Sequence, residues 1–189
     1  MLWILIGAVG GNLEAQSAQP FSLQASGLFN GVFGNVFTGL KDGVGAEAQF
    51  RYTPGALSVG AGFQLTVHKV KGRSEDARLY GGFIEPRHRI HVGSNVVAPY
   101  VSGRFSLLKV GFSGGDLSLS STFMQLNGGG GLLVRLGPRP NLDVGGTFGY
   151  NRLGHGTLTS KFSGTAIPVE SSSGSNVVIR LGLAIGLRD

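Results

Sequence analysis

Three side chains that could form a hydrolytic site lie in one segment rich in Ser and Thr. His155, Ser160 and Glu170 supply a base, a nucleophile and an acid, the residue types that acyl transfer by a serine hydroxyl needs. Ser and Thr are so frequent in this segment that the three types are expected to occur together by chance. The pattern therefore assigns no catalytic residue, and we keep a hydrolase as the alternative to a non-enzymatic protein.

Two further patterns suggest chemistry, and neither satisfies its requirements. The run 128–131 is four glycines, but no Gly-Lys-Ser/Thr ending and no helix follows, as a phosphate-binding loop requires. A glycine-rich strand that permits close approach of its neighbours explains it better. His88 and His91 lack the spacing and the third ligand of a zinc site, and the chain has no Cys. We expect no cofactor and no metal site.

The composition narrows the class of protein. Gly accounts for 34 of the 189 residues, only 14% of residues are charged, and 41% are hydrophobic. The Gly residues follow no three-residue period, which excludes collagen, and the apolar content excludes a disordered polar chain. The net charge is +6, but the basic residues are scattered singly, so nucleic acid is not an expected partner. A β protein or a membrane protein remains.

The amino-terminal segment has the features of an export signal. Residues 2–9 form an apolar run that small residues follow, which predicts a signal peptide over residues 1–18, cleaved near Ala15 or Ala18. A buried strand is the alternative for this run. At eight residues it is too short for a transmembrane helix, which needs about 20. We expect one mature domain over residues 19–189.

The rest of the chain alternates between apolar and polar residues with a period of two. Eight such segments occur, and most have the length that a tilted strand needs to cross a bilayer. They are 21–30, 44–52, 57–68, 80–89, 100–107, 124–136, 142–151 and 176–187. Short connections (53–56, 92–95 and 137–141) alternate with long ones (31–43, 69–77, 108–121 and 152–174). This alternation predicts an all-β fold, an eight-stranded antiparallel up-and-down barrel.

The positions of lysine indicate which face meets lipid. A soluble barrel that binds an apolar ligand has its apolar face inside, whereas a transmembrane barrel has it outside. All five lysines fall in the long connections: Lys41, Lys69, Lys71, Lys109 and Lys161. A strand surface that faces water normally carries lysine. Aromatic residues near the segment ends also fit interfacial girdles: Phe21, Phe29, Phe50, Tyr52 and Tyr150. We favour the transmembrane barrel and keep the soluble periplasmic barrel as an alternative.

The whole mature chain resembles a known family, and one stretch shows this in particular. The stretch 83–87 (FIEPR), followed by 99–104 (PYVSGR), is similar to the central hairpin of small eight-stranded bacterial outer-membrane barrels of the OmpA-domain and OmpX type. The resemblance implies the outer membrane of a Gram-negative bacterium, contact with its lipid and lipopolysaccharide, and insertion by the barrel assembly machinery. Such proteins usually end on an aromatic residue, whereas this chain ends Leu187-Arg188-Asp189. We expect a monomer.

The same resemblance defines the predicted function. Eight strands leave no open pore, so we expect membrane stabilisation, adhesion or ligand contact through the long loops. The enzymatic alternative is a lipid A-modifying acyl hydrolase. In such enzymes a closely spaced Ser follows the His, whereas Gly156-Thr157 follows His155 here.

Two sets of charged residues are predicted to have structural roles. If Leu136 faces Leu142 across its turn, Arg135 lies opposite Asp143 inside the barrel. If Val92 faces Asn95, Glu85 lies opposite Ser102 and diagonal to Arg104. We therefore predict the lumenal ion pairs Arg135–Asp143 and Glu85–Arg104. The cations expected to contact lipopolysaccharide lie in the long connections: Lys69, Lys71, Arg73, Lys109 and Lys161.

Overall fold

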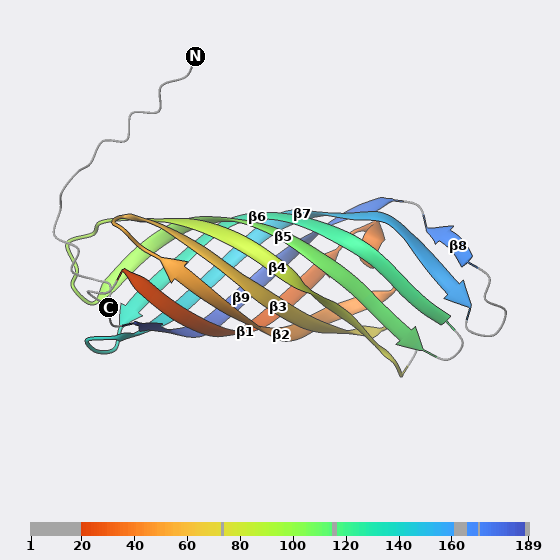
Figure 1. Ribbon diagram of the computed structural model, residues 1–189, viewed down its shortest axis with the longest axis horizontal. Helices are drawn as coiled ribbons and strands as arrows, with labels where there is room; N and C mark the ends of the chain where they lie inside the picture. Colours follow the sequence, from red (N-terminus) through yellow and green to blue (C-terminus); the bar gives the residue numbers. More distant parts are fainter. Residues whose placement is uncertain (1–19, 73, 115–116, 161–165, 170, 188–189) are drawn as a thin grey trace, which may run out of the picture.

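The computed structural model describes residues 20–187, except 73, 115–116, 161–165 and 170. It is an elongated antiparallel barrel (Figure 1). The barrel strands are β1 (Phe21–Phe33), β2 (Leu40–Tyr52), β3 (Leu57–Val70), β4 (Asp76–Arg89), β5 (Val97–Gly114), β6 (Leu117–Arg135), β7 (Pro140–Ser160) and β9 (Ser172–Gly186). A 3-10 helix, η1 (Asn35–Phe37), joins β1 to β2, and a short strand, β8 (Ala166–Val169), pairs with β7.

Each barrel strand pairs with its neighbour in the chain, and β9 closes the cylinder. β9 pairs with β7 on one side and with β1 on the other, so these eight strands leave no edge between them. A closed barrel satisfies backbone hydrogen bonds internally, as a structure within hydrocarbon must. The predicted eight-stranded up-and-down topology is confirmed, and β8 is an addition that the sequence did not predict. Among the residues described, no helix is long and apolar enough to cross a membrane.

The two faces of each strand differ as the alternation predicted. In β1, Phe21, Leu23 and Phe29 are exposed, while Ser22 and Gln24 between them are buried in the lumen. The same pattern continues around the barrel, with large apolar side chains 37–64% exposed on the outer surface. Those outer residues include Val44, Val59, Phe63, Ile84, Leu107, Leu126, Phe148, Ile179 and Leu181. A continuous apolar exterior around a polar lumen is the arrangement of a transmembrane barrel.

The barrel has two distinct ends, which we call the turn end and the loop end. The turn end carries the connections 53–56, 90–96 and 136–139, and the loop end carries η1, the connection 71–75 and β8. At the turn end Phe21 stacks on Phe50 and Tyr52, with ring centroids 5.5 and 5.1 Å apart. These rings lie where an interfacial aromatic girdle was predicted.

The predicted long connections are mostly strand. In place of a loop over 108–121, β5 continues to Gly114 and β6 begins at Leu117. Lys41, Lys69 and Lys109 therefore lie within strands, near their loop ends, and not in loops. The expectation of loops was wrong because it depended on apolar alternation. That alternation is lost from residue 108 onward, because Leu108 and Val110 face the lumen and Lys109 faces outward, although backbone pairing continues.

Two predicted turns also have a different register. The connection between β4 and β5 spans 90–96, with Gly93 at φ +68°, and is not a two-residue turn at Gly93-Ser94. The Ser94 hydroxyl accepts hydrogen bonds from the backbone N–H groups of Val96 and Val97, which stabilises the wider turn. Between β6 and β7, Leu142 pairs with Val134 and not with Leu136. Both registers differ by two residues, so every side chain keeps its predicted face.

Candidate functional sites in the lumen and at the loop end

The middle of the lumen holds a network of buried charges, which we call the ionic layer. Three carboxylates and four guanidinium groups take part, and they come from five of the eight barrel strands. They are Glu47, Arg51, Glu85, Arg87, Arg104, Asp143 and Arg180. None of these residues is more than 4% exposed. Buried charges of this kind are stable only when they are paired and hydrogen-bonded.

Glu85 is the centre of this network. One of its carboxylate oxygens contacts Arg51 at 3.3 Å and also Arg87, and the other contacts Arg180 at 2.9 Å and Arg104 Nε at 2.7 Å. Arg104 also donates to Glu47 at 2.6 Å, which adds a second residue of β2 to the network. The network therefore crosslinks β2, β4, β5 and β9 across the lumen.

Asp143 forms the second centre of the network, at the side of β7. Its oxygens lie 2.9 Å from Arg87 Nη1 and 3.4 Å from Arg180 Nε. They also accept hydrogen bonds of 2.6 Å from the Tyr100 hydroxyl and from the Gln24 amide. Two ion pairs and two hydrogen bonds satisfy this carboxylate, which is fully buried.

The glycine run of β6 makes space for Tyr100. A β-carbon at Gly131 would lie 2.5 Å from the Tyr100 hydroxyl, and one at Gly145 on β7 would also meet that oxygen. Only glycine leaves room for the phenol to cross the lumen toward Asp143. The predicted role of the run 128–131 in close approach is therefore confirmed at Gly131, which faces the lumen.

The lumen contains one of the two predicted ion pairs. Arg104 pairs with Glu85, and it lies directly opposite rather than diagonally, because Ile84 pairs with Phe105 and Arg87 with Ser102. The register predicted for Arg135–Asp143 is wrong. Asp143 lies opposite Leu133, Arg135 lies opposite Asn141, and the ionic partners of Asp143 are Arg87 and Arg180.

Sequence reasoning missed most members of the network. Glu47, Arg51, Arg87 and Arg180 all lie on predicted polar faces, so their inward direction was available from the alternation. Most of their partners were not, because contacts such as Arg51–Glu85, Arg87–Asp143 and Arg180–Glu85 cross the lumen between strands that are not neighbours. A register between adjacent strands gives no information on such contacts.

An uncharged polar layer, which we call the amide layer, follows toward the loop end. The amide of Asn176 accepts from Asn127 and Asn151 at 3.2 and 3.0 Å and donates to Asn30 at 3.1 Å. His68 is fully buried beside Asn30, and its Nδ1 donates to the Lys41 carbonyl at 3.0 Å. These hydrogen bonds join β1, β2, β3, β6, β7 and β9.

An apolar cluster closes the lumen above this layer. Phe37 of η1 folds inward, is 4% exposed, and lies with its ring centroid 5.4 Å from that of Phe123. The other buried members of the cluster are Leu79, Leu108, Val110 and Leu153. The ionic layer, the amide layer and this cluster fill the lumen with side chains, as expected for eight strands.

The outer surface carries a cationic patch just beyond the apolar band at the loop end. We define it as Lys69, Arg78 and Lys109, which point outward from β3, β4 and β5. Lys109 lies opposite Tyr80 and Lys69 opposite Asp76, so each lysine is diagonal to Arg78, about 7–8 Å away at the Cα atoms. Lys69 pairs with Asp76 at 2.9 Å. Among the described residues, neither Arg78 nor Lys109 forms an ion pair.

The patch includes two of the five cations predicted to contact lipopolysaccharide. Lys71 is exposed in the turn beyond β3, while Arg73 and Lys161 lie outside the described residues. Arg78 is not one of those five cations. The alternation in the sequence indicates that it faces outward, since it lies two residues before the exposed Tyr80 on the same face of β4.

The remaining candidate residues do not assemble into a described site. Glu170 lies outside the described residues, and so do the side chains of His155 and Ser160, whose backbones belong to β7. The predicted signal peptide, residues 1–18, also lies outside them. His88 and His91 are exposed near the turn end, and in the described chain no group of three or more His, Cys, Asp or Glu could hold a metal ion.

Comparison with known proteins identifies the fold. No family model and no curated protein matches the sequence. Among solved structures, Neisserial surface protein A (NspA) is 18% identical, with a TM-score of 0.65 over 89% of this chain and 97% of that chain. OprG from Pseudomonas aeruginosa is 10% identical, with a TM-score of 0.56 over 93% and 100%. Ail from Yersinia pestis, in complex with the heparin analogue sucrose octasulfate, is 19% identical, with a TM-score of 0.52 over 87% and 96%. The chain has the fold of the small outer-membrane β-barrels.

Proposed function

We propose that this protein is a non-enzymatic, non-conducting barrel of the outer membrane of a Gram-negative bacterium. In this proposal it stabilises the membrane by binding lipopolysaccharide phosphates at its loop end. The observation that carries the proposal is the position of the cationic patch, directly beyond a continuous apolar band. A barrel seated in lipid by that band places Lys69, Arg78 and Lys109 at the depth of the headgroups. The loop end then faces the cell surface.

The geometry of the patch suits anionic lipid. Tyr80 and Phe63 lie below the cations with ring centroids 6.4 Å apart, so acyl chains meet aromatic rings where phosphates meet Arg78 and Lys109. The guanidinium of Arg78 can bind two phosphate oxygens at once, and the ammonium of Lys109 adds a second charge. Lys69 is partly neutralised by Asp76, so Arg78 and Lys109 provide most of the attraction.

The patch gives a direct test of this proposal. The variant Arg78→Gln/Lys109→Gln and the wild type are refolded into vesicles with and without lipopolysaccharide, and urea unfolding is followed by heat-modifiable migration. Lipopolysaccharide should stabilise the wild type, and the variant should lose about 2 kcal/mol of that gain, roughly 1 kcal/mol for each cation.

A control variant separates binding from general charge loss. Arg139→Gln removes one exposed positive charge at the turn end, far from the patch, and should keep the full gain. Equal stabilisation of all three proteins by lipopolysaccharide would contradict the proposed contact. The apolar band and its membrane insertion would be unaffected by that result.

A second candidate function is adhesion to a sulfated polysaccharide. Ail has been solved with a heparin analogue, and here Lys71 is exposed in the turn beyond the patch, where a ligand in solution could reach it. Retention on a heparin column should fall for Lys71→Gln, whereas lipopolysaccharide stabilisation should not. Unchanged retention would exclude this contact.

A further inference from the structure

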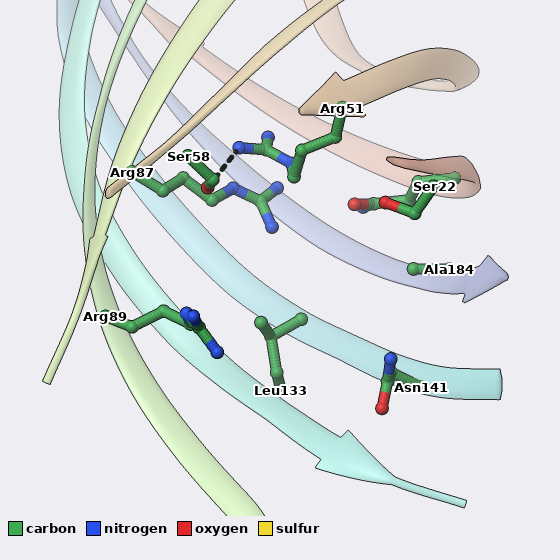
Figure 2. A pocket seen from close by; sticks show the side chains of 9 residues that line it. Ser22, Arg51, Ser58, Arg87, Arg89, Leu133, Asn141 and Ala184 are labelled. Atoms are coloured by element: carbon green, nitrogen blue, oxygen red, sulfur yellow. Dashed lines mark hydrogen bonds between the residues drawn. The ribbon is translucent and has the colours of Figure 1, made fainter. Parts of the chain in front are cut away.

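A recess opens into the lumen at the turn end, opposite the apolar cluster. The space open to water inside it is about 10 Å³, and its mouth opens to solvent. Figure 2 shows the side chains of Arg51, Arg87 and Arg89 reaching toward it from β2 and β4. Ser22 and Ser58 also line it. The walls of the recess therefore combine donor groups of arginine and serine with apolar surface, which includes Leu133 and Ala184.

Three donor groups of these arginines have no partner. In the part of the chain that the structure describes, Arg51 Nε, Arg87 Nη2 and Arg89 Nε are buried and make no hydrogen bond. Arg87 is 2% exposed and Arg51 is 4% exposed, so water does not replace the missing acceptors freely. Unpaired N–H groups of charged side chains are costly in such a site.

The charges around the recess are also unbalanced. The ionic layer and the recess together contain five arginines (51, 87, 89, 104 and 180) and three carboxylates (47, 85 and 143). The carboxylate of Glu85 is shared among four of those arginines, and none of the three carboxylates lines the recess. Positive charge therefore accumulates at the turn-end side of the network.

We infer that this recess binds a small tetrahedral oxyanion, of the phosphate or sulfate class. Guanidinium groups match the oxygens of such ions in pairs, and three line this recess. Ser58 Oγ accepts from Arg51 Nη1 at 3.1 Å, so its own hydroxyl proton is available to donate to the ligand. The ligand is an inorganic oxyanion or the phosphate of a lipid headgroup at this rim, since both present the same oxygens.

This site is separate from the cationic patch. The patch points outward at the loop end, whereas the recess lies inside the barrel at the turn end. Loss of lipopolysaccharide binding at the patch would leave the recess intact, and the reverse also holds.

The experiment measures binding of inorganic phosphate to the refolded protein in a detergent without phosphate. Isothermal titration compares phosphate, sulfate and chloride for the wild type, Arg89→Gln, Arg89→Lys and the control Arg139→Gln. Arg89 is chosen because it is only half-buried and forms no ion pair among the described residues. Each protein is first checked for heat-modifiable migration. If Arg89→Gln does not fold, Ser58→Ala replaces it.

The inference predicts a specific pattern. Phosphate and sulfate should bind the wild type and Arg139→Gln equally, and at least about tenfold tighter than chloride. Arg89→Gln should weaken phosphate binding about tenfold, the loss expected for a charged hydrogen bond, and Arg89→Lys should recover part of it. Competition by short-chain phosphatidic acid would identify the lipid headgroup as the ligand, and its absence would identify the free ion. Chloride binding as tight as phosphate, or equal losses in Arg89→Gln and Arg139→Gln, would overturn the inference.

Discussion

Replacing Glu85 by Gln tests whether the ionic layer stabilises the barrel. The substitution removes one negative charge from a fully buried site and leaves Arg51, Arg87, Arg104 and Arg180 around a neutral amide. Uncompensated buried charge costs about 3–5 kcal/mol, and here four cations lose their shared partner. We therefore expect Glu85→Gln to lower the free energy of unfolding by about 4 kcal/mol.

Arg104→Gln should cost less than Glu85→Gln. Without Arg104, Glu85 keeps three guanidinium partners and Glu47 keeps Arg180 at 3.4 Å, so about 2 kcal/mol is expected, the range for hydrogen bonds to charged groups. The double variant restores the balance of charge. It should cost less than the sum of the single variants, with a coupling energy of about 1–3 kcal/mol.

The assay is urea unfolding of the protein folded in lipid vesicles, followed by migration of unboiled samples on a denaturing gel. The exposed pair Lys69–Asp76 provides the control cycle. Its nitrogen-to-oxygen distance is 2.9 Å, but the two side chains are 66% and 34% exposed, so its coupling should be about 0–1 kcal/mol. Equal coupling in the two cycles would refute the reasoning, because it would mean that water screens the lumen as it screens the surface.

Three other predictions concern the lipid face, the apolar cluster and the orientation of the barrel. Arg in place of Val59 or Leu181, which are 48% and 58% exposed on the outer surface, should each cost about 2–4 kcal/mol in vesicles if the site lies near the midplane. Unchanged urea midpoints would argue for a face that meets water. Phe37→Ala should cost about 3 kcal/mol in the same assay by removing a ring from the apolar cluster, whereas a loss near zero would mean that η1 does not close the lumen. An epitope tag inserted after Gly72, in the loop-end turn between β3 and β4, should be detected on intact cells, and detection only after lysis would reverse the orientation.

The sequence was sufficient for the number of barrel strands, their two faces and the closure of the barrel. This success has a physical cause, since the outer face meets hydrocarbon and the inner face is narrow and polar. The two environments impose a strict alternation, as in Leu23-Gln24-Ala25-Ser26. The orientation of the faces also followed from the sequence, because the lysines were all placed away from the apolar alternation.

The loop-end extensions and the turn registers could not be predicted in the same way. Over 108–123 the alternation is inverted, because Leu108, Val110 and Phe123 face the lumen while Lys109 faces outward, so the apolar-out pattern does not mark the strands there. At the turn end, Gly93-Ser94 matches a two-residue turn locally, but the chain continues to Val97 before β5 begins. A hairpin signal in the sequence fixes where a turn occurs more reliably than where the pairing starts.

The ionic layer was only partly accessible for a related reason. The ion pair Glu85–Arg104 joins adjacent strands. The polar face of each strand and the turn between them were enough to predict it. The contacts of Arg180 with Glu85 and of Arg87 with Asp143 depend on how far side chains reach across the closed cylinder. The recess at the turn end depends on the same geometry.

Fractionation of cells combined with gel migration tests the central claim most directly. The protein is expressed in a Gram-negative host, the membranes are washed with alkali, and the pellet is run on a denaturing gel with and without boiling. An outer-membrane barrel should remain in the washed outer-membrane pellet and should migrate differently before and after boiling. Release into the soluble fraction would contradict the account and would indicate a barrel whose apolar face does not meet lipid.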